Sequence, residues 1–194
     1  MKTIATLVAG AALSLSVATP IFAQDMMASD SMAMENPMVG GAPMSPEMNI
    51  IENAVNSADH TTLVAAVEAA GLVDTLQGPG PFTVFAPTNA AFGALPDGTV
   101  ETLLEPANLE MLQKVLTAHV IAGDYSAADL MAMAEENGGS FGLQTVSGDL
   151  LGFQMIGGSL KVVDESRNAA DITIADVNQS NGVIHVVDAV LVPE

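Results

Sequence analysis

The sequence contains no cysteine and no tryptophan, and only 4 of its 194 residues are lysine or arginine, against 23 aspartates and glutamates. Without cysteine there can be no disulfide, no zinc–thiolate or blue-copper site, no thiol nucleophile and no lipid-anchoring cysteine. A formal net charge of −19 leaves too few cations to neutralise phosphates, so nucleic acid is excluded as a partner. An acidic chain of this kind must be stable without covalent cross-links.

The sequence has one long apolar run, and it lies at the N-terminus. A short n-region with Lys2 precedes the run over residues 4–17, and the small residue Ala23 marks a cleavage point. The run has about 14 residues, whereas a membrane-spanning helix needs about 20. We therefore predict a signal peptide over residues 1–23, and a mature chain that is secreted or periplasmic and has no transmembrane segment.

Residues 24–44 form a Met-rich segment of low complexity, mixed with Ser, Ala, Asp, Pro and Gly. The pattern favours neither helix nor strand, so a flexible arm is predicted. Thioethers are soft ligands, and an exported arm of this composition could bind Cu(I) or Ag(I). The methionines that would do so are Met26, Met27, Met32, Met34 and Met38. We favour a spacer whose methionines are incidental or absorb oxidation, because the arm contains no histidine.

Helix-capping and turn residues recur regularly over residues 45–194, as expected for one folded domain, and 150 residues suit a single core. Apolar residues recur at helical spacing in four segments of the first half. The predicted helices begin near Ser45, Thr61, Pro106 and Ser126. The first has the apolar stripe Met48, Ile51 and Val55, and the last carries a capping box and ends at Asn137-Gly138.

The second half is predicted to be a β-meander, because short apolar and alternating segments are separated by glycine-containing turns. The expected strands cover residues 141–146, 150–156 and 160–163, a half-exposed strand around Ile172 and Ile174, and residues 183–192. The last run is apolar on both alternating faces, which indicates a central strand covered on both sides. The predicted fold class is α+β, in a single domain.

The segment from Gly80 to Phe92 has the clearest local pattern. A short strand rich in aromatic and β-branched residues, with Phe82 and Phe85, ends at a proline. Thr88 can then cap a helix, and Phe92 is expected to turn back onto the strand.

Four ordered blocks of the sequence together resemble the fasciclin domain over roughly residues 45–193. They are Thr61-Thr62-Leu63-Val64-Ala65-Ala66 with Ala70-Gly71-Leu72, residues 80–92, Leu116-Thr117-Ala118-His119-Val120 with Gly123, and residues 181–193. The resemblance implies a wedge-like β-sandwich flanked by helices, in secreted or surface proteins concerned with adhesion and matrix binding, and it does not imply an enzyme. The family often has tyrosine before the histidine of the third block, where this sequence has Ala118, so adhesion through that pair is in doubt.

Within these blocks, one set of residues is expected to carry the fold rather than any chemistry. Thr88 should cap a helix, Asn181-Gly182 should form a hairpin corner, and Asp188 should accept hydrogen bonds, since an unpaired carboxylate would be costly. The full set is Phe82, Phe85, Thr88, Phe92, His119, Asn181, Gly182, Ile184, His185 and Asp188.

The three histidines are the most plausible catalytic or metal-binding groups. His185 and Asp188 are three residues apart on a predicted strand, so their side chains point to opposite faces. We expect His119 and His185 to be buried and hydrogen-bonded, and His60, beside Asp59, to be solvated or to cap a helix. No histidine spacing is typical of a zinc site, so we predict no metal and no cofactor for the domain.

The residues Gly138-Gly139-Ser140-Phe141-Gly142 match the G-x-S-x-G pattern of serine hydrolases. That chemistry needs a strand-to-helix turn, whereas here a predicted helix ends and a strand begins. We interpret the glycines as turn residues and expect no catalytic residue. A hydrolase would require an exposed Ser140 within hydrogen-bond reach of His119 or His185.

The sequence therefore predicts an exported, non-catalytic binding or adhesion module that presents a rigid domain to a protein, glycan or matrix partner. The alternative is a periplasmic protein that handles Cu(I) or Ag(I) through its Met-rich arm. Comparing Cu(I) uptake by the mature chain and by a form that starts at Ser45 would distinguish the two.

Overall fold

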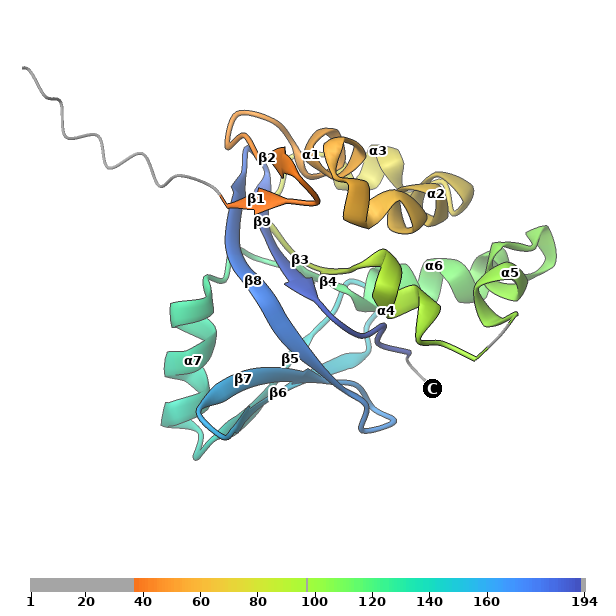
Figure 1. Ribbon diagram of the computed structural model, residues 1–194. Coiled ribbons are helices and arrows are strands. Elements are labelled where there is room, and N and C mark those ends of the chain that lie inside the picture. The colour runs from red at the N-terminus through yellow and green to blue at the C-terminus, as the bar shows by residue number, and fades with distance from the viewer. Residues whose placement is uncertain (1–36, 97, 193–194) are drawn as a thin grey trace, which may run out of the picture. The chain divides into compact units, whose positions relative to one another are not determined.

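A seven-stranded sheet in the order β4-β3-β9-β8-β7-β6-β5 organises the fold (Figure 1). The computed structural model describes residues 37–96 and 98–192, which belong to one unit. The strands of this sheet are β3 (Phe82–Pro87), β4 (Val120–Ala122), β5 (Ser140–Gln144), β6 (Leu150–Ile156), β7 (Ser159–Val163), β8 (Ala169–Gln179) and β9 (Gly182–Val187). A separate two-stranded sheet contains β1 (Met38–Val39) and β2 (Ala42–Pro43).

The two edges of the large sheet meet. Ile121 in β4 forms an isolated antiparallel bridge with Thr145, just after β5, and the Val146 N–H donates to the Val120 carbonyl at 2.8 Å. The long strand β8 pairs with β9 over most of its length and with β7 near its start, so it passes from one half of the sheet to the other. The closure pairs backbone groups that edge strands would otherwise leave open.

The helices lie on both sides of this sheet (Figure 1). They are α1 (Ile50–Asn56), η1 (Ala58–His60), α2 (Thr61–Ala69), α3 (Val73–Leu76), α4 (Asn89–Gly93), α5 (Thr99–Leu104), η2 (Pro106–Asn108), α6 (Leu109–Ala118) and α7 (Ala127–Glu136). The first six α-helices gather beside β3 and β9, whereas α7 packs against β5 and β6. The predicted α+β class is confirmed. None of these helices is long and apolar enough to span a membrane.

The helix signals around residue 126 act as the sequence indicates. The Ser126 hydroxyl accepts a hydrogen bond from the Asp129 N–H at 3.2 Å, and the Asp129 carboxylate accepts from the Ser126 N–H at 3.1 Å. This reciprocal capping box begins α7. The second helix is also as predicted, since α2 begins at Thr61 and buries Leu63 and Val67.

The first helix differs from the prediction. It begins at Ile50 rather than near Ser45, because Asn49 and Glu52 form a capping box there. Met48 and Val55, two members of the predicted stripe, are 41% and 58% exposed.

A polar residue determines which face α1 buries. Asn53 is fully buried, and its side-chain amide donates to the Ser45 carbonyl at 2.7 Å and to Gln179 in β8. This contact holds Asn53 inward with Ile50 and Ile51. The buried face of α1 therefore shares only Ile51 with the predicted apolar stripe.

Short elements were missed for a simple reason. The helices α3 and α5 have 4 and 6 residues. Elements of this length do not repeat a period often enough to be recognised. The last strand also ends earlier than predicted, at Val187 instead of residue 192, although Val190 and Leu191 are still buried.

Residues 37–44 differ from the flexible arm predicted over residues 24–44. They form the β1–β2 hairpin, in which Met38 pairs with Pro43 and Val39 with Ala42. Val39 and Met44 are buried in the core of the helical side. The apolar side chains at these two positions therefore join the folded unit, and residues 24–36 lie outside the described residues, as does the predicted signal peptide.

The parallel pair β3 and β9 separates two cores. Phe85 lies opposite His185 in register, and successive side chains along each strand face opposite sides. Val84 and Ile184 belong to the core beneath the helices, whereas Phe85 and Val187 belong to the core of the meander and α7. The prediction of a central, doubly covered last strand is confirmed, since β9 lies between β3 and β8.

Candidate functional site

The residues that the sequence singles out gather around the β3–β9 pair. Phe85, Phe92 and Ile184 are buried, and Phe82 is partly buried at the start of β3. Thr88 lies immediately after β3, and its hydroxyl accepts a hydrogen bond from the Ala91 N–H at 3.3 Å, which caps α4.

Asn181 joins three distant segments. Its side-chain oxygen accepts from the Ile50 N–H at 3.1 Å, at the start of α1. Its amide donates to the carbonyls of Leu76 at 2.7 Å and Gly78 at 3.1 Å. A single side chain therefore fixes α1 and the end of α3 to the corner between β8 and β9.

The corner itself lies one residue earlier than predicted. The two loop residues are Ser180 and Asn181, and Gly182 is already the first residue of β9. Gly182 has a φ of 154°, and a Cβ there would collide with the Phe82 carbonyl. Glycine is required at this position because β3 approaches closely, in addition to its role beside a turn.

The spacing of His185 and Asp188 predicted that their side chains would not pair, and Asp188 bonds to other residues. Its carboxylate accepts from the Asp171 N–H at 2.8 Å, and its own N–H donates to the Asp171 carbonyl at 3.2 Å. The Asp171 carboxylate in turn pairs with Lys161 at 2.6 Å. The end of β9 is thus held to β8 by polar contacts at the surface.

His119 is a neutral cross-link between α6 and the C-terminal segment. It is 3% exposed, its Nδ1 donates to the Val115 carbonyl at 2.7 Å, and its Nε2 accepts from the Leu191 N–H at 3.0 Å. These partners define one neutral tautomer. Burial lowers the pKa of His119 to about 4, so the ring stays uncharged at neutral pH.

His185 has a similar role on β9. It is fully buried, its Nε2 donates to the Tyr125 carbonyl at 2.9 Å, and its Nδ1 accepts from the Asp176 N–H at 3.3 Å. Its ring stacks on Phe85 with centroids 5.4 Å apart. Burial lowers the pKa of His185, although the carboxylates of Asp176 and Asp124 oppose the shift.

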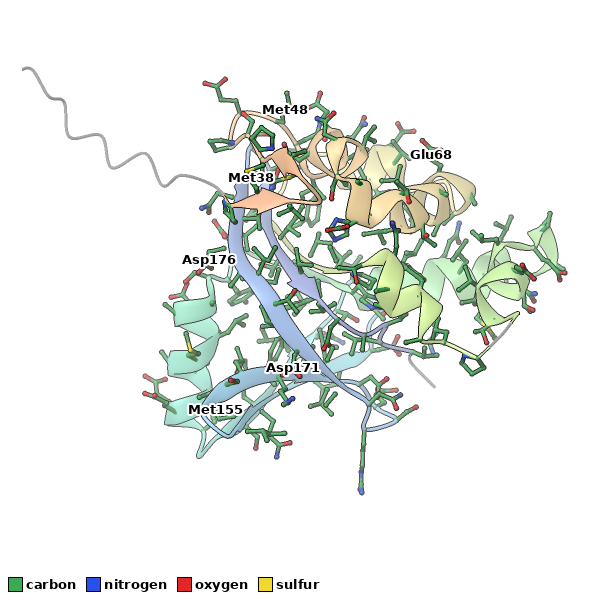
Figure 2. The ribbon with its side chains drawn as sticks, viewed as in Figure 1. Met38, Met48, Glu68, Met155, Asp171 and Asp176 are labelled. Carbon is green, nitrogen blue, oxygen red and sulfur yellow. The ribbon has the colours of Figure 1, made fainter. Side chains whose placement is uncertain are left out.

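Asp176 is a residue that the sequence did not single out. Figure 2 shows it on β8 beside the start of α7, where its carboxylate accepts from the Ala127 N–H at 2.7 Å. Its φ of 56° and the adjacent register shift mark a β-bulge. The bulge turns Asp176 toward the helix and its N–H toward His185.

Asn89 is a second residue of this kind. Its side-chain oxygen accepts from the Thr62 N–H at 3.0 Å, and its amide donates to the Ala58 carbonyl at 2.9 Å. The contacts join α4 to the start of α2, and no local sequence signal indicates a partner 27 residues away.

His60 contradicts the expectation of a solvated or capping residue. It is 3% exposed and occupies the N-cap position of α2 without making a side-chain cap. The 3₁₀ turn η1 directs the ring inward, where Nδ1 lies 2.9 Å from the Ser57 hydroxyl. Burial lowers the pKa of His60, opposed by a hydrogen bond toward the Ala86 backbone and by the Asp59 charge. That contact lacks the distance and angle of a formed hydrogen bond, so the buried Nε2 is geometrically unpaired.

A cavity of about 40 Å³ lies beside His60. It is bounded by α1, α2, the β1–β2 hairpin and the face of β3 and β9, and both His60 and His119 contribute to its wall. Apart from these rings and Ser57, the lining is apolar. It is the place in the helical core where a polar atom without a partner meets free space.

The geometry gives no support to a serine hydrolase at the glycine-rich segment. Ser140 is exposed at the start of β5. Both ring nitrogens of His119 and of His185 bond to backbone groups, so neither ring is engaged as a base for Ser140.

Of the five methionines that could bind Cu(I) or Ag(I), only Met38 lies within the described part of the chain. Met38 is 63% exposed on β1, and Met26, Met27, Met32 and Met34 lie outside the described residues. Over residues 37–96 and 98–192, no group of three or more His, Asp or Glu side chains could hold a metal ion.

Comparisons with known proteins agree with this architecture. A family model for the Fasciclin domain matches residues 58–193. Protein sll1483 of Synechocystis sp. is 43% identical, over 100% of this chain and 99% of that protein. Cell surface glycolipoprotein MPB83 of Mycobacterium bovis is 32% identical, over 83% of this chain and 68% of that protein.

A solved structure has the same fold. It is a FAS1 domain pair from the insect cell adhesion molecule Fasciclin I, with a TM-score of 0.67 at 18% sequence identity. The match covers 78% of this chain and 52% of that chain. The chain therefore spans about half of that domain pair.

Proposed function

The chain belongs to the fasciclin domain family, and from this premise we propose that it is a non-enzymatic binding or adhesion module that presents a rigid domain surface to a protein, glycan or matrix partner. One observation carries the proposal. The side chains best suited to chemistry, His119 and His185, are buried and use both ring nitrogens to hold the backbone. Because these ring nitrogens already bond to the backbone, the two histidines stabilise the domain that presents the surface and are not free to act on a substrate.

The proposed location is outside the cytoplasm, in a periplasm or secreted. The leader-like residues 1–23 support export. The relative MPB83 is described as a cell surface glycolipoprotein. We extend that location to this chain as part of the proposal.

The charge of the chain indicates which partners its surface favours. With 23 acidic and 4 basic residues, the surface repels anionic membranes and polyanionic glycans. Two of the cations, Lys114 and Lys161, already pair with Asp149 and Asp171. A neutral or basic partner therefore fits best, and association with a basic partner should slow as ionic strength rises.

The test is affinity capture from the envelope or extracellular fraction, followed by rebinding of the captured partner in purified form. Because Val39 and Met44 are buried, the shortened bait should begin at Glu35 and not at Ser45. Equal binding by the mature chain and this bait is expected, which assigns the partner to the domain.

Two results would contradict the proposal. Saturable binding that requires residues 24–34 would transfer the function to the Met-rich segment. Turnover of an ester substrate that Ser140→Ala abolishes would make the protein an enzyme.

A further inference from the structure

The cavity beneath the β1–β2 hairpin has an apolar wall. Val39 and Met44 line it from the hairpin side, and Leu63 and Val67 line it from α2. All four are buried aliphatic or thioether side chains. A volume of about 40 Å³ exceeds the roughly 10–15 Å³ that one water molecule needs.

One residue that lines this cavity, His60, has an unpaired ring nitrogen. The Ser57 hydroxyl is buried, and its partner in the structure is His60 Nδ1 at 2.9 Å. If the hydroxyl donates to Nδ1, both groups are satisfied there and Nε2 carries the ring proton. That Nε2 is buried and unpaired.

A water molecule is a poor occupant of this site. A buried water normally makes about three hydrogen bonds. Here His60 Nε2 is the unpaired polar atom, because both nitrogens of His119 are occupied by Val115 and Leu191. A molecule with an apolar body and one acceptor satisfies the donor and also fills the apolar space.

We propose that the cavity is a binding site for a small aliphatic molecule with one oxygen acceptor, a hydroxyl or a carbonyl, which accepts a hydrogen bond from His60 Nε2. The aliphatic part lies against Leu63, Val67 and Met44. The site is internal, so the inference does not rest on the surface proposed for partner binding.

The β1–β2 hairpin is the part of the cavity wall that we expect to move when a ligand enters. It forms its own two-stranded sheet, so it can move without breaking the large sheet. Met38 lies on the outer side of β1 (Figure 2) and is 63% exposed, whereas its neighbour Val39 faces inward. Among the described residues, the Ala58 N–H donates to the Gly40 carbonyl at 3.2 Å and joins the hairpin turn to η1. A ligand larger than the closed cavity therefore enters by displacing this hairpin.

The first experiment titrates the mature chain with hexanol, and with hexane as the control that lacks oxygen, followed by ¹⁵N NMR and calorimetry. Saturable shifts are expected in α1, α2 and the hairpin. Hexane is the more hydrophobic ligand and the hexanol hydroxyl loses hydration on burial, so the hydrogen bond is measured by removing the His60 donor, which should weaken hexanol about tenfold and leave hexane unchanged. The Nε2 proton of His60 should shift only with hexanol.

Two pairs of variants test the assignment. His60→Phe removes the donor and keeps an aromatic ring, so hexanol should bind about tenfold more weakly than to the unaltered chain, while hexane binds equally well to both. Val64→Phe places a larger side chain in the lining and should abolish binding of both, whereas Val100→Phe, on α5 and away from the cavity, should leave binding unchanged.

Several outcomes would overturn the proposal. They are the absence of saturable shifts with hexanol, an unchanged ratio of hexanol to hexane affinity in His60→Phe, unchanged binding in Val64→Phe, or a bound water on His60 Nε2 that hexanol does not displace. If His60→Phe fails to fold, the Nε2 proton of His60 in the unaltered chain still decides the question, because it should shift with hexanol and not with hexane.

Discussion

The two cores on either side of the β3–β9 pair are packed in different ways. On the meander side, Phe153 contacts Phe85 with ring centroids 5.5 Å apart and Phe141 at 4.9 Å. On the helical side, branched aliphatic residues such as Leu63 and Val67 pack around a cavity. Aromatic rings fill the first core with large fixed shapes, whereas the second keeps free volume next to a polar atom.

The hydrogen bonding of two buried histidines, His185 and His60, differs between the two cores in the same way. On the meander side, both ring nitrogens of His185 have backbone partners. On the helical side, His60 has one partner at Nδ1 and none at Nε2. A polar group without a partner lowers stability, so the helical core is the less optimised of the two. Unsatisfied polar groups and free volume are typical of places reserved for ligands.

Removal of a core side chain should show the largest difference between the two cores. Phe153→Ala deletes a fully packed ring, and we expect a loss of about 4 kcal/mol in the free energy of unfolding. Val67→Ala, beside the cavity, should cost about 2 kcal/mol or less, because fewer neighbours are lost. Urea denaturation with an unchanged m-value measures both. Equal losses would remove the distinction.

Acid should weaken the links that the buried histidines form. Since the pKa of His119 is lowered from 6.5 to about 4 in the folded state, the unfolded chain takes up a proton first as the pH falls. Stability is therefore complete above 6.5 and decreases toward about 4, by about 3 kcal/mol from this residue. His60 and His185 have lowered pKa values and act in the same direction.

The measurement is the free energy of unfolding across this pH range, with proton uptake on unfolding from calorimetry. An NMR titration of His119 provides the control, because its ring should stay neutral until the pH approaches about 4. Constant stability between the two pH limits would contradict the assignment.

The corner residue Asn181 should stabilise the attachment of the helical side to the β8–β9 corner. Asn181→Ala leaves the Ile50 N–H and the carbonyls of Leu76 and Gly78 without this partner. Because these groups are only partly buried and water can replace some bonds, we expect a loss of about 2 kcal/mol. Asn137→Ala, which removes one exposed bond to Met133 at the end of α7, is the matched control and should change stability by about 0.5 kcal/mol or less.

Adding one methylene group should have opposite effects in the two cores. Val67→Ile extends a side chain in the cavity lining, so stability should increase by about 0.8 kcal/mol. Val162→Ile adds the same group to a fully buried site among the rings, and overpacking should lower stability by about 1 kcal/mol. Thermal unfolding of the two variants measures whether each change raises or lowers stability. A loss in both variants would mean that the cavity cannot accept an extra group.

Much of the fold could be predicted from the sequence because its signals are local. The capping box at Ser126, the cap at Thr88 and the glycine turn before β7 each act within a few residues. The alternating and doubly apolar segments identify strands in the same way. The four family blocks then indicate how these elements assemble.

The positions that could not be predicted depend on distant partners. Asn53 is buried in a helix because Gln179, 126 residues away, accepts its amide. His60 turns inward because η1 and the hairpin cover it, although its neighbours in sequence are polar. A composition rule assigned residues 37–44 to a flexible arm, but Val39 and Met44 find an apolar core that the composition does not show.

By itself, the sequence determined the α+β class, the boundaries of α2 and α7, the cap of α4, the strands of the meander and the commitment of two histidines to the interior. Those properties follow from side-chain spacing and capping, which act over one or two turns of chain. Only the tertiary structure decided that β3 and β9 pair in parallel, that His60 faces a cavity and that the hairpin covers it. Such contacts join segments up to 131 residues apart, and their free energy appears only when the intervening chain has folded.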